Sequence, residues 1–470
     1  MRPRSLFDSA GAALAPLLTR EQSKAITDRV LAMSTADETR VAVDSSWEGN
    51  TRFAGGEITT SGEAVNTTVS VSTVIGKRRA STTTNLLDDA SLRRSVDLAI
   101  RMAKLSPEDP ELMPELAAQN YVNVNGFLEK TANLGAESRA EAVRRVLTRA
   151  GEVGRPAGDV FVAGYLEAGA IARAIANNRG LFAYHRSTDA GLSTTVRTPD
   201  RTGSGWASAG ARDWGTIDPA ALGARAAQKA VASRNPQGIE PGLYTVVLEP
   251  QAVADLVPQL AGAFNARNAD EGRGAFSKRG GGNKLGEKVA DERVILYSDP
   301  ADPDLLAQPF DGEGFPLKRR TWIENGILKN LSHSRFGAQK QGVEATGGGG
   351  GGGGGFGGGL PGGLKMVGGT KSTEELIAGV PRGILVTRFW YIRPLDPRTV
   401  LLTGLTRDGT FLIENGKITR SLKNFRWNES PLFLLGKIDE IGRAERTAAG
   451  QVMPSLRARD FNFTSLSDAV

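Results

Sequence analysis

The chain has 470 residues, which is too long for one ordinary hydrophobic core and predicts two or three domains. Its formal charge of +6 comes from 58 basic and 52 acidic residues that are interspersed, so no basic stripe favours nucleic acid as a partner. The absence of cysteine excludes disulfides, thiol nucleophiles and thiolate metal ligands.

No stretch of the sequence approaches the roughly 20 apolar residues that a membrane helix needs. Residues 5–18 are mildly apolar, but Asp8 interrupts them and no small-residue cleavage pattern follows. We therefore expect a cytoplasmic protein with no signal peptide and no membrane partner.

The N-terminal part of the chain combines helices with an alternating strand. Thr19 and Gln22 have the spacing of a capping box, which predicts a helix that runs to about Met33. Residues 65–75 alternate apolar and polar side chains, as half-buried strands do. A second helix is expected to begin at Ser91, because apolar residues recur from there at helical spacing.

The middle of the chain predicts a helix around residues 143–150 and then a strand around residues 160–166. Asn177–Gly180 has the composition of a tight turn and indicates a hairpin. Asp218 followed by Pro219 is a typical start for the alanine-rich helix that comes next.

The third region opens with a β-branched run, Tyr244–Leu248, which predicts a buried strand. A helix is expected after it, and Pro258 should kink that helix because proline lacks the backbone N–H. The apolar face of the expected helix consists of Val253, Leu256, Val257, Leu260 and Phe264.

The sequence Ile-Glu-Asn-Gly occurs twice, at 323–326 and at 413–416. Each Asn-Gly pair lies between β-formers and suits a type I′ turn, so both copies predict β-hairpins. Between them, residues 347–369 are nearly all glycine and are expected to form a flexible loop, since glycine loses much entropy on ordering. That loop is either a surface insertion or a lid over a cleft. Ser372 and Glu375 form a second capping-box pattern.

These elements predict an α+β protein of three domains. Residues 19–107 would form an N-terminal α/β unit, and residues 108–240 a middle α+β region. Residues 241–466 would form a large C-terminal domain that is rich in antiparallel β-hairpins and contains the flexible loop.

The C-terminal features occur in a characteristic order. The acidic glycine turn Asp311–Pro316 comes first, followed by a hairpin, a polar helix-like run, the glycine-rich loop, a capped helix and the second hairpin. Taken together, this order resembles the C-terminal half of the TldD/PmbA family, whose members are also described as modulators of DNA gyrase. Residues 75–105 and 368–389 resemble the family's N-terminal and final elements.

The active subunits of this family resemble zinc metallopeptidases with a His-Glu-x-x-x-His motif on the helix after the buried strand. The resemblance places Pro258 at the first histidine, Gln259 at the catalytic glutamate and Ala263 at the second histidine. Proline and alanine have no side-chain metal donor, and an amide cannot take up a proton as a carboxylate does. We therefore expect no catalytic residues and no metal site at this degenerate motif.

The rest of the sequence offers few replacements. A catalytic zinc needs about three protein ligands, and the chain has only two histidines, His185 and His333. A site built from His333 with Asp311 and Glu313 stays open as an alternative. No Gly-x-Ser-x-Gly motif between a strand and a helix indicates a serine nucleophile.

This pattern is similar to the PmbA-like (TldE-like) half of the family. The resemblance implies a companion subunit without its own cofactor, which pairs with a zinc-bearing TldD-like paralogue or with itself as a dimer. An extended peptide substrate could add as a strand to the hairpin edges, and we expect Asp311, Glu313, Arg320 and Asn415 to line that groove. Two other hypotheses stay open, a regulatory binding protein of the gyrase-modulator kind and a divergent hydrolase with an unrecognised site.

Overall fold

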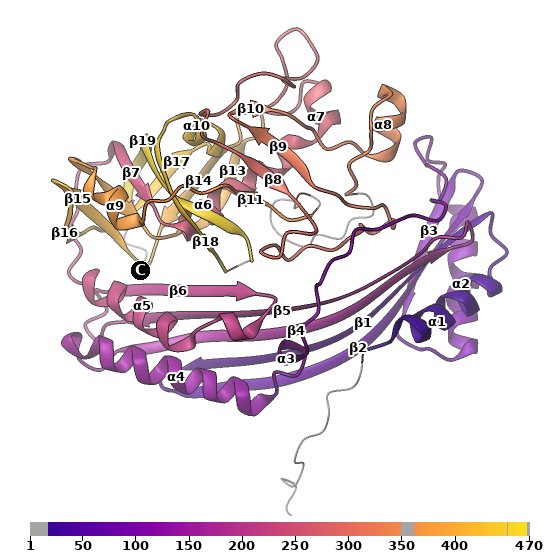
Figure 1. The fold of residues 1–470 in the computed structure, drawn as a ribbon, viewed down its shortest axis with the longest axis horizontal. Helices are drawn as coiled ribbons and strands as arrows, with labels where there is room; N and C mark the ends of the chain where they lie inside the picture. Colours follow the sequence, from indigo (N-terminus) through magenta and orange to yellow (C-terminus); the bar gives the residue numbers. More distant parts are fainter. Residues whose placement is uncertain (1–16, 349–359, 361, 449, 468–470) are drawn as a thin grey trace, which may run out of the picture.

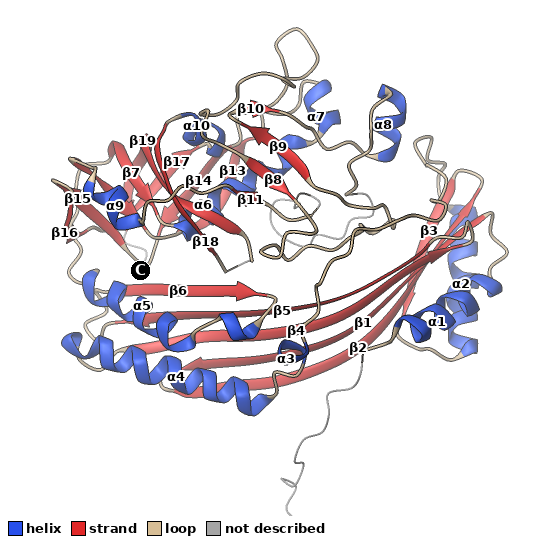
Figure 2. Ribbon diagram, viewed as in Figure 1, coloured by secondary structure: helices blue, strands red, loops and turns tan. Residues whose placement is uncertain are grey.

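The computed structural model describes residues 17–348, 360, 362–448 and 450–467, and the chain folds into two β-sheets with helices packed on them (Figures 1 and 2). The α+β class expected from the sequence is confirmed. None of the described helices combines the length and the apolar character needed to cross a membrane.

The first sheet has six antiparallel strands in the order β3-β2-β1-β4-β5-β6. Their bounds are β1 Glu38–Ala54, β2 Glu57–Ile75, β3 Arg78–Thr84, β4 Phe161–Asn177, β5 Phe182–Arg197 and β6 Ser204–Ala211. The central pair joins β1 to β4 from Arg40 opposite Asn177 to Ala54 opposite Ala163. The N-terminal and middle regions expected from the sequence therefore share one sheet.

Helices cover one face of this sheet, and the other face is turned toward the C-terminal part (Figure 2). α1 Arg20–Met33 and α2 Asp89–Leu105 lie at one end of the sheet, and α4 Ala136–Gly154 and α5 Pro219–Ala232 lie toward the other. The short helix α3 Glu129–Ala132 lies between them. Every second residue of β1, from Val41 to Phe53, is buried on the helix-covered face. The alternation that predicts a half-buried strand thus positions a polar face toward the second sheet.

The second sheet has a main path of nine strands, β10-β9-β8-β11-β19-β7-β12-β15-β16, with β13, β14, β17 and β18 attached beside it. The strands are β7 Gly242–Leu248, β8 Leu296–Ser298, β9 Arg320–Glu324, β10 Ile327–Leu328, β11 Lys365–Met366, β12 Arg382–Val386, β13 Phe389–Asp396, β14 Leu401–Thr406, β15 Thr410–Glu414, β16 Lys417–Ser421, β17 Asn424–Glu429, β18 Ile438–Arg446 and β19 Val452–Ser467. The α-helices are α6 Pro250–Leu256, α7 Ala266–Asp270, α8 Arg335–Gln341, α9 Thr373–Ala378 and α10 Pro431–Gly436. Three short 3₁₀ helices complete the described elements: η1 Arg155–Ala157, η2 Trp214–Thr216 and η3 Val257–Phe264.

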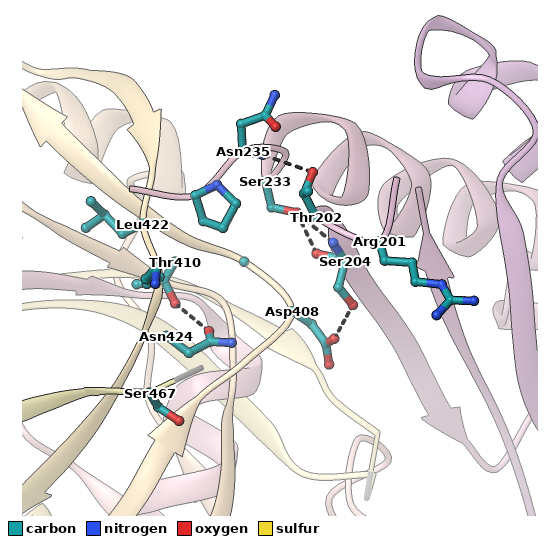
Figure 3. A pocket seen from close by; sticks show the side chains of 13 residues that line it. Arg201, Thr202, Ser204, Ser233, Asn235, Asp408, Thr410, Leu422, Asn424 and Ser467 are labelled. Atoms are coloured by element: carbon teal, nitrogen blue, oxygen red, sulfur yellow. Dashed lines mark hydrogen bonds between the residues drawn. The ribbon is translucent and has the colours of Figure 1, made fainter. Parts of the chain in front are cut away.

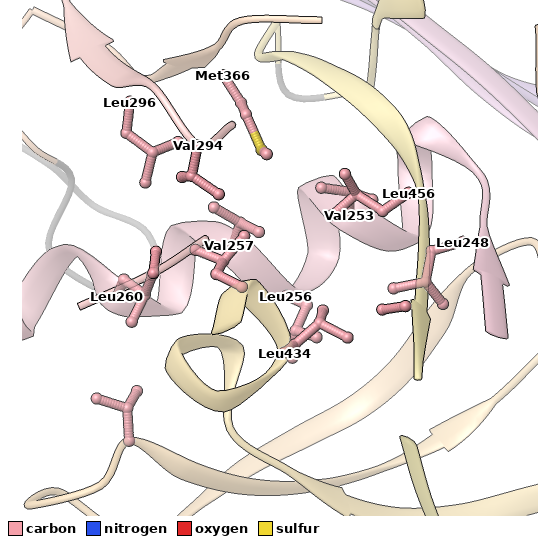
Figure 4. Close-up of a cluster of buried hydrophobic side chains, with 14 of the residues drawn as sticks. Leu248, Val253, Leu256, Val257, Leu260, Val294, Leu296, Met366, Leu434 and Leu456 are labelled. Carbon is pink, nitrogen blue, oxygen red and sulfur yellow. The ribbon is translucent and has the colours of Figure 1, made fainter. Parts of the chain in front are cut away.

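The largest core lies around α6 and η3, where side chains from several strands converge (Figure 4). The labelled members are Leu248, Val253, Leu256, Val257, Leu260, Val294, Leu296, Met366, Leu434 and Leu456. All five apolar positions predicted for the segment after β7 are buried. This core fixes the backbone that carries the candidate site.

The local signals are confirmed at several points. Thr19 and Gln22 form both hydrogen bonds of a capping box, and so do Ser372 and Glu375. Asp218 caps α5 through the backbone N–H of Ala220 at 3.0 Å. Both Asn-Gly pairs have positive φ at each residue and join β9 to β10 and β15 to β16, as a type I′ turn requires.

The prediction that Pro258 kinks a continuous helix was wrong. The α-helix does not continue through a kink but ends at Leu256, and η3 follows. Proline has no N–H to donate four residues back, and the tighter 3₁₀ pattern accommodates the segment.

Other boundaries also differ from the sequence-based expectation. The strand expected at 65–75 begins at Glu57, and the strand expected at 160–166 continues to Asn177. The flexible loop expected at 347–369 falls mostly on residues 349–359 and 361, which lie outside the described residues. Its C-terminal end was placed too late, because Lys365 and Met366 form β11 and the Met366 side chain is buried.

We expect Gly416, in the turn between β15 and β16, to tolerate a side chain less well than Gly76. A Cβ at Gly416 would lie 2.5 Å from the carbonyl oxygen of Ala378, whereas one at Gly76, also at positive φ, would meet nothing within 4 Å. Gly416→Ala should therefore reduce the free energy of unfolding by about 1–3 kcal/mol more than Gly76→Ala, because only the former adds a steric clash to the φ strain. Chemical denaturation of both variants measures this, and equal losses would contradict it.

Candidate functional site

A cleft of about 900 Å³ opens between the α6–η3 segment and the strands β13 and β14. Pro258, Gln259 and Ala263, the positions of the degenerate motif, all line it. The facing wall is formed by residues 388–394 and 400–402. The structure thus brings the three motif positions to one concave surface.

The side chains in the cleft do not fit the zinc that the family resemblance implies. Pro258 and Ala263 carry no donor atom, and the Gln259 amide nitrogen donates to the carbonyl oxygen of Asp255 at 3.4 Å. Within the described ranges, no group of three His, Cys, Asp or Glu side chains is arranged to hold a metal ion.

Asp255, on α6, is a carboxylate in the lining of the same cleft. One oxygen accepts from the Gln251 amide at 2.8 Å, and the other accepts from the backbone N–H of Phe389 at 2.8 Å. Burial raises the pKa of Asp255 to about 6, although Arg388 acts in the opposite direction. The carboxylate therefore fastens α6 to the first residue of β13.

Arg388 connects the cleft wall to the first sheet. Its guanidinium carbon lies 4.0 Å from the ring centre of Trp206, on β6, and 5.2 Å from that of Trp390. It also forms an ion pair of 3.4 Å with the buried carboxylate of Asp408. Through these contacts the position of the cleft wall depends on how the two sheets pack.

A smaller cavity of about 370 Å³ lies at this junction (Figure 3). Ser204, at the start of β6, donates a hydrogen bond of 2.6 Å to Asp408 in the C-terminal part. Arg201, Asn235 and Asp408 line the cavity with φ of 61°, 50° and 55°, which are uncommon for residues other than glycine. The hydrogen bond between Ser204 and Asp408 therefore joins the first sheet to the C-terminal part beside this cavity.

The Asp311 turn also lies at the junction between the sheets. One carboxylate oxygen of Asp311 accepts from the N–H groups of Glu313 and Phe315 at 2.9 and 3.0 Å, and the other accepts from Gly348 at 2.9 Å. Burial nevertheless raises the pKa of Asp311. Next to it, the Tyr121 hydroxyl donates to the Gly314 carbonyl at 2.8 Å. Asp311 is therefore engaged in shaping the turn.

Of the four residues predicted to line one groove, Asp311 and Glu313 share one turn, whereas Arg320 and Asn415 lie near opposite ends of the second sheet. Glu313 is in the Asp311 turn and pairs with Arg335 at 3.4 Å. Arg320 begins β9 and bonds Asn330 at 3.3 Å, near one end of the nine-strand path. Asn415 is exposed in the turn before β16, at the opposite end of that path.

The two hairpins differ in the edge that they offer. The N–H of Leu328 in β10 donates to Glu287 and its carbonyl accepts from Gly286, so residues 286–289 cover that edge. The expectation of strand addition at β10 is therefore wrong. β16 is the last strand of the path. Apart from its pairing with β15, the backbone hydrogen bonds of the described residues include one to β16, from the N–H of Gln237 to the carbonyl of Ser421, the last residue of the strand.

The two histidines lie in different environments. Burial lowers the pKa of His333, and the acid that opposes this shift is Asp270, rather than Asp311 or Glu313. Burial and Arg212 lower the pKa of His185, on β5, to about 4. The alternative site built from His333, Asp311 and Glu313 is not assembled in the described part of the chain.

The residues of the facing wall were not predicted from the sequence. Arg388, Phe389, Trp390 and Tyr391 form a cationic and aromatic run whose exposed members line the cleft. That run of three aromatic residues in a chain with 6% aromatics was the available signal. Only the pairing of β13 with β14 places it opposite Pro258.

Comparison with known proteins agrees with this architecture. Three models of the PmbA/TldA metallopeptidase family match the chain, domain 1 at residues 40–103, the central domain at 85–234 and the C-terminal domain at 241–465. The chain therefore belongs to the PmbA/TldD metallopeptidase family.

Individual relatives are distant. A metalloprotease of Methanothermobacter thermautotrophicus is 26% identical over 237 residues, and the match spans about half of each protein, 49%. The crystal structure of TldE from Thermococcus kodakarensis has a TM-score of 0.81 at 20% identity over 94% of this chain and 99% of that one. A putative modulator of a DNA gyrase from Thermotoga maritima has a TM-score of 0.82 at 22% identity over 94% and 100%. At these identities the two structures establish the fold alone.

Proposed function

We propose that the chain is the subunit without a metal site in a cytoplasmic peptide-processing complex, in which a TldD-like paralogue holds the zinc. The observation that carries this proposal is the cleft itself, which has a volume of about 900 Å³ although its motif positions are Pro258, Gln259 and Ala263. The solved relative named TldE has the same fold. A second copy of this chain in place of the paralogue is the alternative arrangement.

The cleft supplies binding rather than chemistry in this proposal. Its volume is within the range of sites for small ligands and short peptides, and its walls are largely apolar. The open edge of β16 lies on the same sheet and suits an extended chain. Asp311 and Glu313 would then act by holding the junction between the sheets, Arg320 would fasten β9 to Asn330, and Asn415 would shape the turn that presents β16.

A divergent hydrolase is the second candidate, and Asp255 is the observation that favours it. Its carboxylate lines the cleft and has a pKa of about 6, near the range for a general acid or base. Both of its oxygens already accept hydrogen bonds from Gln251 and Phe389, which makes this candidate the weaker one. A regulatory role in the manner of a gyrase modulator rests on the name of a relative and has no favouring geometry.

The test uses the full chain, alone and mixed with a purified TldD-like paralogue from the same genome. We expect a stable complex at micromolar concentration in light scattering, hydrolysis of an unstructured peptide by the mixture only, and zinc in the paralogue by metal analysis. His333→Ala should leave all three results unchanged. One tightly held zinc in the isolated chain, or hydrolysis by the isolated chain that Asp255→Asn abolishes, would overturn the proposal.

A further inference from the structure

The first sheet has a border along β2 that no other described strand covers. β2 runs from Glu57 to Ile75, but β3 pairs only with its residues 69–75 (Figure 1). On the side away from β1, residues 60–68 have no neighbouring strand among the described residues, and this segment is here named the β2 edge. From outside β1, its backbone receives one described hydrogen bond, of 3.4 Å, from Arg139 to the Gly62 carbonyl.

The direction of the free backbone groups follows from the hairpin between β2 and β3. Ile75 and Arg78 flank the two-residue turn Gly76–Lys77. The first and last residues of such a turn share a hydrogen bond, so the N–H and C=O groups of Ile75 point toward β3. These groups alternate in direction along a strand, and the register of β2 is continuous over residues 60–74. The residues whose groups point to the open side of the β2 edge are therefore Ser61, Glu63, Val65 and Thr67.

Several other border strands are protected against pairing with a further strand. Natural sheets shield their edges with covering segments, bulges, proline, short strands or basic side chains. In this chain residues 286–289 cover β10, bulges and Pro394 interrupt β13, β3 has seven residues and starts with two arginines, and β16 has five residues, two of them basic. The β2 edge has a bulge at one end, at Thr59, and contains no proline, lysine or arginine. An unprotected edge of nine residues suits an added strand.

The residues of the β2 edge are complementary to a second copy of themselves. With a two-fold axis at Ala64, the opposite residues are Thr60 with Thr68, Ser61 with Thr67, Gly62 with Asn66, Glu63 with Val65, and Ala64 with its own copy. Hydroxyl pairs of this kind are favourable across antiparallel strands. Glu63, the one charged residue, lies opposite an apolar residue and already pairs with Arg139 at 3.0 Å. In this register all four residues whose groups point outward form hydrogen-bonded pairs.

We propose that the β2 edge is a self-association surface, to which a second copy of this chain adds its own β2 in the antiparallel direction. The two six-stranded sheets then continue into each other across the two-fold axis. The second copy is the occupant because the same nine residues supply both sides of the hydroxyl pairs and of the register. The inference goes beyond the proposed function, since it requires neither a peptide nor the paralogue.

Cysteine cross-linking of the full chain tests the register, because the chain has no cysteine of its own. Opposite residues of a non-hydrogen-bonded pair lie close enough for a disulfide, so Ala64→Cys should form a covalent dimer under mild oxidation. Asn66→Cys is the matched control and should stay uncross-linked, because it faces residue 62 of the second copy rather than residue 66. Combining Gly62→Cys with Asn66→Cys should restore the covalent dimer.

Light scattering over a range of concentrations measures the association without a cross-link. The full chain should be a dimer at micromolar concentration. Val65→Pro removes an N–H that points to the open side, where proline is tolerated in a single chain, and should raise the dissociation constant of the dimer by about tenfold or more. Val65→Thr keeps this N–H and the β-branched shape and should associate like the wild type. Far-ultraviolet circular dichroism checks that both variants are folded.

A wild type that stays monomeric at high micromolar concentration would overturn the inference. Equal cross-linking of Ala64→Cys and Asn66→Cys, or a folded Val65→Pro variant that dimerises like the wild type, would do the same. If Val65→Pro loses the paralogue while self-association is unchanged, the β2 edge is the paralogue contact and the second copy is the wrong occupant. The proposed function fails separately, if the mixture with the paralogue forms no complex and hydrolyses no peptide, whether or not the chain pairs with itself.

Discussion

Replacing Arg139 with alanine is expected to lower the free energy of unfolding of the first sheet by about 3–5 kcal/mol. The Arg139 side chain, on α4, is fully buried. Its guanidinium donates to the Leu134 carbonyl at 2.7 Å, to the Thr51 hydroxyl at 3.2 Å and to Glu63 at 3.0 Å. The substitution leaves these acceptors without their donor and opens a cavity between α4 and β1, which explains the size of the loss.

Arg144→Ala on the same helix is the control. Arg144 pairs with Glu141 three residues earlier, and both side chains are more than half exposed, so the loss should be close to zero. Urea unfolding followed by near-ultraviolet circular dichroism measures both variants. The account of Arg139 fails if the two midpoints shift by the same amount.

Asp255→Asn is expected to stabilise the protein at neutral pH and to leave it unchanged near pH 4. The pKa of Asp255 is about 6 in the folded chain and near 3.8 ordinarily, so the folded state binds the proton more tightly. Stability therefore falls as pH rises from about 4 to about 6 and then levels off. The asparagine keeps a carbonyl oxygen for the Phe389 N–H and has no proton to lose, so its advantage above pH 6 should reach at most about 3 kcal/mol.

Asp396→Asn, at the rim of the same cleft, is expected to destabilise the protein at neutral pH, which is the opposite of the effect of Asp255→Asn. Hydrogen bonds from the Thr399 hydroxyl and the Arg398 N–H lower the pKa of Asp396, so its ionised form contributes stability at neutral pH that is lost as pH falls. Unfolding free energies of the wild type and both variants at pH 4, 5, 6 and 7 test the pair. Parallel pH curves for the wild type and Asp255→Asn would contradict the assignment.

The features that follow from short-range chemistry were predictable from the sequence. Capping by Thr19, Asp218 and Ser372 depends on residues three or fewer positions away, and the Asn-Gly turns depend on two adjacent residues that tolerate positive φ. The apolar spacing after β7 likewise indicated which side chains are buried. It did not indicate the type of helix, because the same side chains are buried by the 3₁₀ turns after Leu256.

The candidate site was predictable only in part. The resemblance placed Pro258, Gln259 and Ala263 at the degenerate motif, and these three residues do face one cleft. The opposite wall was missed because Trp390 and Tyr391 lie more than a hundred residues later and reach the cleft through the pairing and the bulge of β13. Arg320 and Asn415 were grouped by motif order, although β9 and β16 lie near opposite ends of the strand order.

Sequence alone established the family resemblance, the α+β class, the lack of cysteine and the lack of metal donors at the motif, since these depend on residue identity and local spacing. Only the folded chain settles three other features. Residues 38–211 share one sheet, residues 286–289 cover the β10 edge, and the bulge of β13 places Trp390 and Tyr391 at the cleft. Each of these depends on backbone pairing between segments distant in the sequence. Such pairing is selected by how well whole surfaces pack together, and no short stretch of residues specifies it.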